Sequence, residues 1–100
     1  MDDVQLRRHS TAPRVMILDI LGAEGDLDDD QILAAWTARR PGLAAAHVRR
    51  LPRMLGEILW RLLNLEWVTQ IDGRYRLTAL GRRAWVQARG DTGQEHPSGA

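Results

Sequence analysis

The chain has 100 residues, of which 44% are hydrophobic and 27% are charged, so we expect one soluble domain with a single modest core. The absence of cysteine excludes a disulfide framework and a thiolate metal site, and no run approaches the roughly 18 apolar residues of a membrane-spanning helix. The formal net charge of +1 is small, but it is the sum of an acidic N-terminal part and a strongly basic remainder.

The first segment, residues 1–12, is predicted to be a flexible N-terminal arm. It carries two early acids and no apolar core, so it does not resemble a signal peptide, and we expect a cytoplasmic location. Ser10 or Thr11 can then cap a helix whose first turn holds Pro13. The run PRVMILDIL is strongly apolar, which predicts a largely buried helix that ends at Gly22.

A second helix is predicted after the loop AEGDL. Asp26 is the candidate N-cap, and the acids that follow lie where the helix dipole favours negative charge. The expected apolar side consists of Ile32, Leu33, Ala35 and Trp36. Pro41-Gly42 ends the helix. The run Asp28-Asp29-Asp30 does not predict a metal site, because consecutive residues fan around a helix.

The third helix has a clear apolar pattern. Residues 43–51 favour a helix, and Pro52 either starts a new helix or kinks a longer one. Apolar residues recur with helical spacing and form a core stripe at Leu51, Leu55, Ile58, Leu62 and Leu65. The opposite side carries polar and charged residues, namely Arg53, Glu57, Arg61 and Asn64. Glu57 and Arg61 are spaced to pair with each other.

The stretch VTQIDGRYRLTALG predicts a β-hairpin. Asp-Gly is a strong hairpin signal, because a type I′ turn needs positive φ at both central positions. The turn sets a register in which Val68 faces Leu77, and alternation along the strand places Tyr75 on the same face. Arg74 and Arg76 then project from the opposite face.

A last helix, ALGRRAWVQAR, is predicted to begin after Thr78 as its N-cap. Residues 90–100 are small and polar, and we expect them to be a disordered tail. The folded domain therefore spans residues 13–89. Its predicted class is mainly α with a small β-hairpin, in the order α-α-α-β-β-α, and the hairpin must pack on the helices because two strands alone are not stable.

The charges divide along the chain. Residues 1–30 hold three Arg and eight acids, whereas residues 31–90 hold eleven Arg and three acids. Every basic residue is Arg, which reflects either a GC-rich genome or the suitability of the planar guanidinium for phosphates and guanine edges. A domain with this distribution has one face suited to a polyanion.

The segment LLNLEWVTQIDGRYRLTALGRRAW, residues 62–85, resembles the winged helix-turn-helix superfamily, in particular MarR-like and PadR-like bacterial transcriptional regulators. It is similar to the end of a recognition helix, a short strand, the wing and the Leu-Thr-x-x-Gly-Arg step of those regulators. VMILDILGAEGDLDDDQILAAW, residues 15–36, matches their first two helices more loosely. The resemblance implies binding to double-stranded DNA, with the third helix in the major groove and the wing along the backbone.

Carried over to this chain, the recognition helix covers about residues 52–65 and the wing residues 68–77. The resemblance then assigns DNA contacts to Arg49, Arg50, Arg53, Glu57, Arg61, Arg74 and Arg76. Each Arg on a phosphate releases counterions and makes the affinity depend on salt. An Arg aimed at guanine adds discrimination between bases.

A second interpretation is a winged-helix module that binds another protein. PRMLGEILWRLLN is apolar on more than one side, and Trp60 belongs either to the core or to an exposed patch. An exposed Trp on an apolar patch favours a protein interface. A homodimer is compatible with both interpretations, and it would use the N-terminal arm, the first helix or the last helix around Trp85.

The sequence has no pattern that indicates an enzyme, a cofactor or a metal ion. It lacks a Gly-rich phosphate loop after a strand, a nucleophile elbow and an HExxH motif. His9, His47 and His96 are far apart and have no ligand spacing. Asp19 is the one acid among the apolar residues of the first helix, and we expect it at the solvent edge of that helix.

Overall fold

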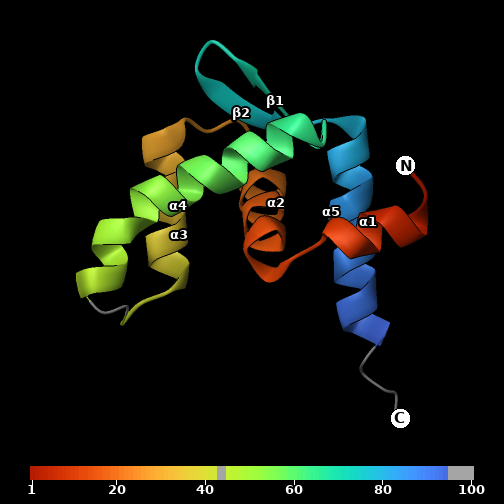
Figure 1. Cartoon of the computed structure of the whole chain (residues 1–100), viewed down its shortest axis with the longest axis horizontal. Coiled ribbons are helices and arrows are strands. Elements are labelled where there is room, and N and C mark those ends of the chain that lie inside the picture. The colour runs from red at the N-terminus through yellow and green to blue at the C-terminus, as the bar shows by residue number, and fades with distance from the viewer. Residues whose placement is uncertain (43–44, 95–100) are drawn as a thin grey trace.

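The computed structural model describes residues 1–42 and 45–94, which contain five helices and one two-stranded antiparallel sheet (Figure 1). The elements are α1 (Asp3–His9), α2 (Ala12–Glu24), α3 (Asp29–Arg39), α4 (Ala45–Asn64), β1 (Val68–Ile71), β2 (Arg74–Leu77) and α5 (Ala79–Gln94). The prediction of a mainly α fold with a small hairpin is confirmed, and the described residues contain one helix more than the predicted order.

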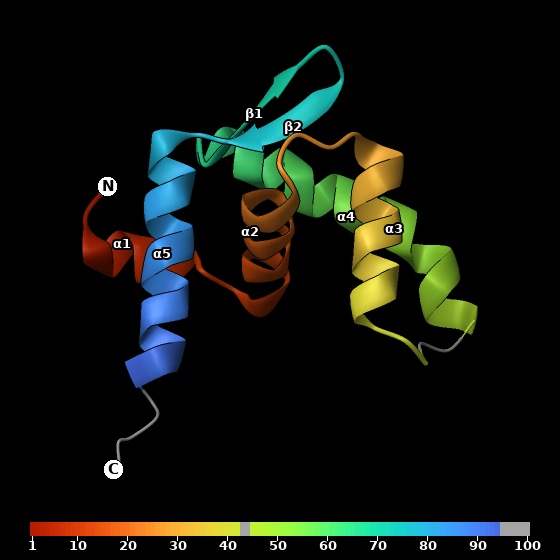
Figure 2. The ribbon, with the colours of Figure 1, turned by 180° about the vertical axis from the view of Figure 1, so that it is seen from behind.

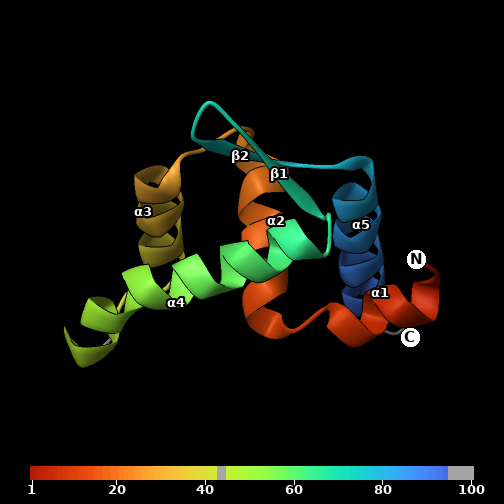
Figure 3. The ribbon, with the colours of Figure 1, turned by 45° about the horizontal axis from the view of Figure 1, so that its top comes forward.

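Helix α2 lies at the centre of the arrangement. It contacts α3, α4, α5 and β2, and it stands between α3 and α5 in both the front and the back view (Figures 1 and 2). Helix α4 crosses α2, and the hairpin projects above the C-terminal half of α4 when the top is tilted forward (Figure 3). Helix α4 therefore packs on the core with one side and turns its other side to solvent.

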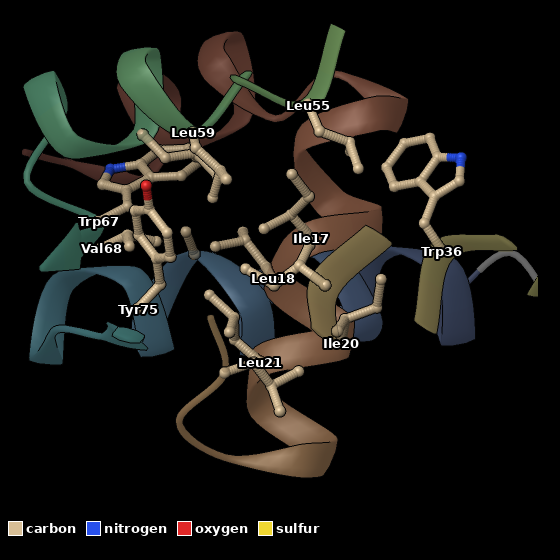
Figure 4. Close-up of a cluster of buried hydrophobic side chains, with 14 of the residues drawn as sticks. Ile17, Leu18, Ile20, Leu21, Trp36, Leu55, Leu59, Trp67, Val68 and Tyr75 are labelled. Carbon is tan, nitrogen blue, oxygen red and sulfur yellow. The ribbon is translucent and has the colours of Figure 1, made fainter. Parts of the chain in front are cut away.

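The core gathers apolar side chains from α2, α3, α4 and the hairpin (Figure 4). On α2 the buried residues are Ile17, Leu18, Ile20 and Leu21, while Val15 is half-buried. On α4 they are Leu51, Leu55, Leu59 and Leu62. The predicted α4 stripe is thus confirmed, with Leu59 buried more deeply than the flanking Ile58 and Leu65.

The N-terminal segment differs from the expected flexible arm. Residues 3–9 form α1, which begins with a capping box between Asp2 and Gln5. Leu6 is only 1% exposed, and α1 packs on α5. Burial of this apolar side chain favours an ordered helix in the segment. At the other end, α5 extends beyond the predicted limit at Arg89 to Gln94, and residues 95–100 of the predicted tail lie outside the described residues.

The prediction that the first helix ends at Gly22 is wrong. Helix α2 continues to Glu24 and ends at Gly25, whose φ of 88° suits glycine. Gly22 has a packing role instead, because a Cβ at this position would lie 2.7 Å from the ring of Trp85. A side chain at position 22 would therefore have to displace the ring of Trp85.

The N-cap of α3 is Asp28 rather than the predicted Asp26. The Asp28 carboxylate accepts a hydrogen bond from the Gln31 backbone N–H at 2.8 Å, and the Gln31 side chain accepts one from the Asp28 N–H at 2.9 Å. This reciprocal capping box satisfies both backbone donors at the start of the helix. Asp26 is left outside the helix, where it pairs with Arg76 of the hairpin.

Helix α4 is one helix of 20 residues with Pro52 in its interior. The alternative in which Pro52 lies within a longer helix is therefore confirmed. The helix ends where Glu66 adopts a φ of 63° and the Trp67 N–H donates to the Leu62 carbonyl at 3.1 Å. This ending turns the chain directly into β1.

The hairpin has the predicted register. Val68 pairs with Leu77, and the turn residues Asp72 and Gly73 have φ values of 52° and 77°. Tyr75 is 8% exposed on the face toward the core. After the hairpin, Thr78 caps α5 as predicted, because its Oγ1 accepts a hydrogen bond from the Gly81 N–H at 3.0 Å.

Gly81 marks a close contact between α5 and the start of the hairpin. A Cβ at Gly81 would lie 1.8 Å from the carbonyl oxygen of Trp67, and this backbone atom is itself fixed by the Thr78 N–H at 3.0 Å. Any side chain at this position would therefore push the helix and the hairpin apart.

We expect Gly81→Ala to lower the free energy of unfolding by about 3 kcal/mol or more, because the added methyl meets backbone that cannot yield. Gly56→Ala is the matched control: it adds the same methyl within a helix where no atom lies within 4 Å, so stability should rise by about 0.5–1 kcal/mol. Urea unfolding followed by circular dichroism measures both changes. Equal stabilities of the two variants would contradict the close contact.

Candidate nucleic-acid interface

The outer side of α4 carries most of the predicted contact residues. Because the leucine stripe faces the core, the residues opposite to it are solvent-exposed, namely Arg49, Arg50, Arg53, Glu57 and Arg61. The structure brings Arg53, Glu57 and Arg61 together on the wall of one groove. Arg49 and Arg50 lie nearer the start of the same helix. The outer side thus presents four guanidinium groups and one carboxylate.

The charged side chains of this face make weak contacts with their neighbours. Glu57 pairs with Arg53 at 3.7 Å rather than with Arg61, and the two side chains are 72% and 90% exposed. Such exposed pairs contribute little to stability. The Arg61 guanidinium lies 5.7 Å from the centre of the Trp60 ring. These arginines can therefore exchange their present contacts for a phosphate or a base at small cost.

Trp60 is the exposed aromatic residue of this face. Its exposed fraction is 60%, whereas Trp36 and Trp67 are buried and Trp85 is half-buried, so only Trp60 departs from a core role. It lines a groove of about 680 Å³ between α4 and the start of α2. The lining residues are Thr11, Pro13, Arg14, Arg53, Gly56, Glu57, Ile58, Trp60 and Arg61.

Arg14 is a member of this groove that the sequence pattern does not reveal. It belongs to the first turn of α2, and its Nη1 donates a hydrogen bond to the His9 carbonyl at 3.0 Å. An isolated Arg after a proline has no spacing that relates it to α4, since the contact arises only from the crossing of the two helices. The groove therefore has cationic groups on both walls.

The two hairpin arginines have different surroundings. Arg76 forms an ion pair with Asp26, from the loop between α2 and α3. The Arg74 side chain is exposed and has no ion pair or hydrogen bond with any residue in the described part of the chain. Arg76 thus has a structural contact that the sequence did not indicate, whereas Arg74 remains available to a ligand.

The loop before α3 also fixes strand β2 of the hairpin. The Tyr75 N–H donates to the Leu27 carbonyl at 2.7 Å, and the Leu27 N–H donates to the Tyr75 carbonyl at 3.2 Å. Together with the ion pair between Arg76 and Asp26, these bonds attach two adjacent residues of β2, Tyr75 and Arg76, to the loop. The position of Arg74 relative to the core is therefore well defined.

Tyr75 has a perturbed hydroxyl group. Burial raises its pKa above the ordinary value of 10.0, and the nearby Asp29 carboxylate raises it further through its charge and as a hydrogen-bond acceptor. Asp29 and Asp30 line a small hollow of about 240 Å³ with Tyr75 and Pro52. No three His, Asp or Glu side chains within residues 1–42 and 45–94 come together as a metal site requires.

A second groove lies between α1, α2 and α5, and it has a volume of about 630 Å³. Trp85 and Asp19 contribute to its lining. The Asp19 carboxylate accepts hydrogen bonds from the Trp85 indole at 3.1 Å and from Arg39 at 2.9 Å. Asp19 is half-buried, which agrees with its expected place at the solvent edge of the helix, and its hydrogen bonds join α2 to both α3 and α5.

No protein-family model, curated protein sequence or solved structure matches this chain. Within the residues that the structure describes, no helix is both long enough and apolar enough to cross a membrane. The α4 face and the hairpin, through their geometry and charge, are therefore the features that indicate a function.

We expect the pKa of Tyr75 to exceed 10.0 in the folded protein, and Asp29→Asn to bring it partly back while burial remains. Because folding raises the pKa of Tyr75, the neutral hydroxyl contributes to the free energy of unfolding. This contribution is fully present below the unfolded pKa of about 10, and it is lost as pH rises through the pKa of the folded state. The chain has one tyrosine, so tyrosinate absorbance reports this group alone. A folded pKa at or below 10.0 would contradict the buried position.

Proposed function

We propose that this chain is a DNA-binding transcriptional regulator of the winged helix-turn-helix type, similar to MarR-like and PadR-like bacterial regulators and acting in the cytoplasm. In this proposal α4 is the recognition helix and the β1–β2 hairpin is the wing. The order from α2 to α5 is the order that the resemblance implies. The observation that carries the proposal is the outer face of α4, with four exposed Arg and one exposed Glu that the core does not use.

The proposed contacts divide by chemistry. Arg49, Arg50 and Arg53 bind phosphates at the N-terminal part of the helix, where each contact releases counterions. Arg61 and Glu57 face base edges, since Arg recognises guanine and a carboxylate accepts a hydrogen bond from the cytosine amino group. These contacts give the site both a salt-dependent affinity and a sequence preference.

The hairpin contributes Arg74 from a fixed position. Its strand β2 is held by Asp26 and Leu27, so little order has to be created when DNA binds. Contacts made by a group that is already ordered cost less conformational entropy. Arg74 reaches a phosphate or the minor groove next to the α4 contact.

A second candidate function is a module that binds another protein through Trp60. The 60% exposure of this ring favours it. Five of the nine residues that line the surrounding groove are polar or charged, however, and only Pro13 and Ile58 add apolar side chains beside the ring. This alternative gains support if the chain shows no salt-dependent binding to DNA.

The homodimer through α1, α2 or α5 remains a prediction under both functions, and analytical ultracentrifugation measures it.

Fluorescence anisotropy with duplex DNA at two salt concentrations tests the proposed function. We expect Arg53→Ala with Arg74→Ala to weaken binding by about tenfold or more and to lower the slope of log affinity against log salt by about 2. The control pair Arg82→Ala with Arg89→Ala removes the same charge from α5, where both side chains lie against Trp85, and should have a much smaller effect. Equal losses for the two pairs, or no binding at low salt, would contradict the assignment.

The role of Arg76 can be separated from that of Arg74. If Arg76 acts by anchoring the hairpin, Arg76→Ala and Asp26→Ala remove the same ion pair and should weaken DNA binding by similar, several-fold factors. The same titration measures both variants. Tighter binding by Asp26→Ala would show instead that Arg76 contacts DNA directly once its partner is removed.

A further inference from the structure

We propose that the groove beside Trp60 binds one unpaired nucleobase, so that the preferred ligand is a DNA duplex interrupted by an unpaired nucleotide. This inference rests on the proposed function, because it assumes that the outer face of α4 contacts DNA. It adds a ligand class that the phosphate and base-edge contacts do not require.

The position of Trp60 on α4 is the first observation. The ring is 60% exposed on the same side of the helix as Arg53 and Asn64, so a nucleic acid held by Arg53 and Arg61 also meets the indole. The backbone around it is secured, because the Asn64 Nδ2 donates to the Trp60 carbonyl at 2.7 Å. An aromatic side chain is thus presented to the ligand from a rigid helix.

The chemistry of the groove is the second observation. A nucleotide combines a flat base, a polar base edge and a phosphate. The groove offers an indole for the base, the Glu57 carboxylate as an acceptor for an amino group, and Arg14 and Arg53 for the phosphate. The groove has a volume of about 680 Å³ and opens to solvent, so a nucleotide can approach it from outside.

An intact duplex cannot use this arrangement fully. Paired bases are stacked on one another, so they offer α4 only their edges, and the main apolar contact among these is the thymine methyl. An unpaired base exposes its π face, and stacking of that face on an aromatic ring is a main source of affinity in single-strand binding.

Charge complementarity favours this occupant over an apolar protein surface. Arg14, Arg53 and Arg61 surround the ring, and Glu57 is the one acid that lines the groove. Burying these guanidinium groups against an apolar partner would remove their water, and the present contacts of Arg14 with the His9 carbonyl and of Arg53 with Glu57 would leave most of their N–H donors without acceptors, which is costly. A polyanion supplies the acceptors, and its base supplies the surface for the ring.

The test compares three labelled DNAs of the same sequence: an intact duplex, the same duplex with one unpaired central thymine, and the single strand. Anisotropy titrations are made with the wild type, Trp60→Ala and Trp60→Phe. Because Trp60 is 60% exposed, these variants should keep their fold, and thermal unfolding checks this point. Stacking of a base on Trp60 should quench the fluorescence of its indole. The part of the quenching that the wild type shows and Trp60→Phe does not show reports this stacking directly.

We expect the wild type to bind the interrupted duplex about tenfold more tightly than the intact one, which corresponds to one stacked base. Trp60→Ala should lose this preference, with a much larger loss of affinity for the interrupted duplex than for the intact one, and Trp60→Phe should keep part of the preference. Equal wild-type affinity for the two duplexes, or an equal loss on both in Trp60→Ala, would overturn the inference and leave the proposed function standing. If none of the DNAs binds, both fail and the protein-binding alternative takes their place.

Discussion

The burial of α2 is the constraint on which the rest of the structure depends. Its residues Ile17, Leu18 and Ile20 are fully buried, and the helix contacts α3, α4, α5 and β2. The half-buried carboxylate of Asp19 is costly without partners, and it binds Arg39 of α3 and the Trp85 indole of α5. Helix α2 thereby sets the positions of its neighbours and leaves α4 with one packed and one open side.

The open side of α4 and the hairpin form one functional unit in this account. The core uses the leucines of α4 and the inward face of the hairpin, so the outward arginines are not required for folding. Among the residues that the structure describes, Arg76 has a side-chain partner and Arg74 has none, and the partner of Arg76 fixes the hairpin from which Arg74 projects. The same packing that stabilises the domain therefore orients the groups that we assign to DNA.

Local patterns predicted the hairpin register, the cap at Thr78 and the leucine stripe, because these depend on residues close in sequence. Helix α1 was missed although its capping box has a local signal, since the burial of Leu6 depends on α5 more than 70 residues later. The pairing of Arg76 with Asp26 and the place of Arg14 beside Trp60 also arise from tertiary packing. Gly22 was predicted to end the helix from its residue type alone. Its packing against the distant Trp85 ring is a tertiary contact that local sequence does not show.

The central claim is that the outer face of α4, together with the hairpin, is the surface that meets DNA. A heteronuclear NMR titration of the full chain with a short duplex at low salt tests it most directly, because every backbone amide is an independent reporter. We expect the largest shift changes between Arg49 and Arg61 and around Arg74, and we expect them to disappear at high salt. Shift changes confined to α1 and α5 around Trp85 would contradict the claim.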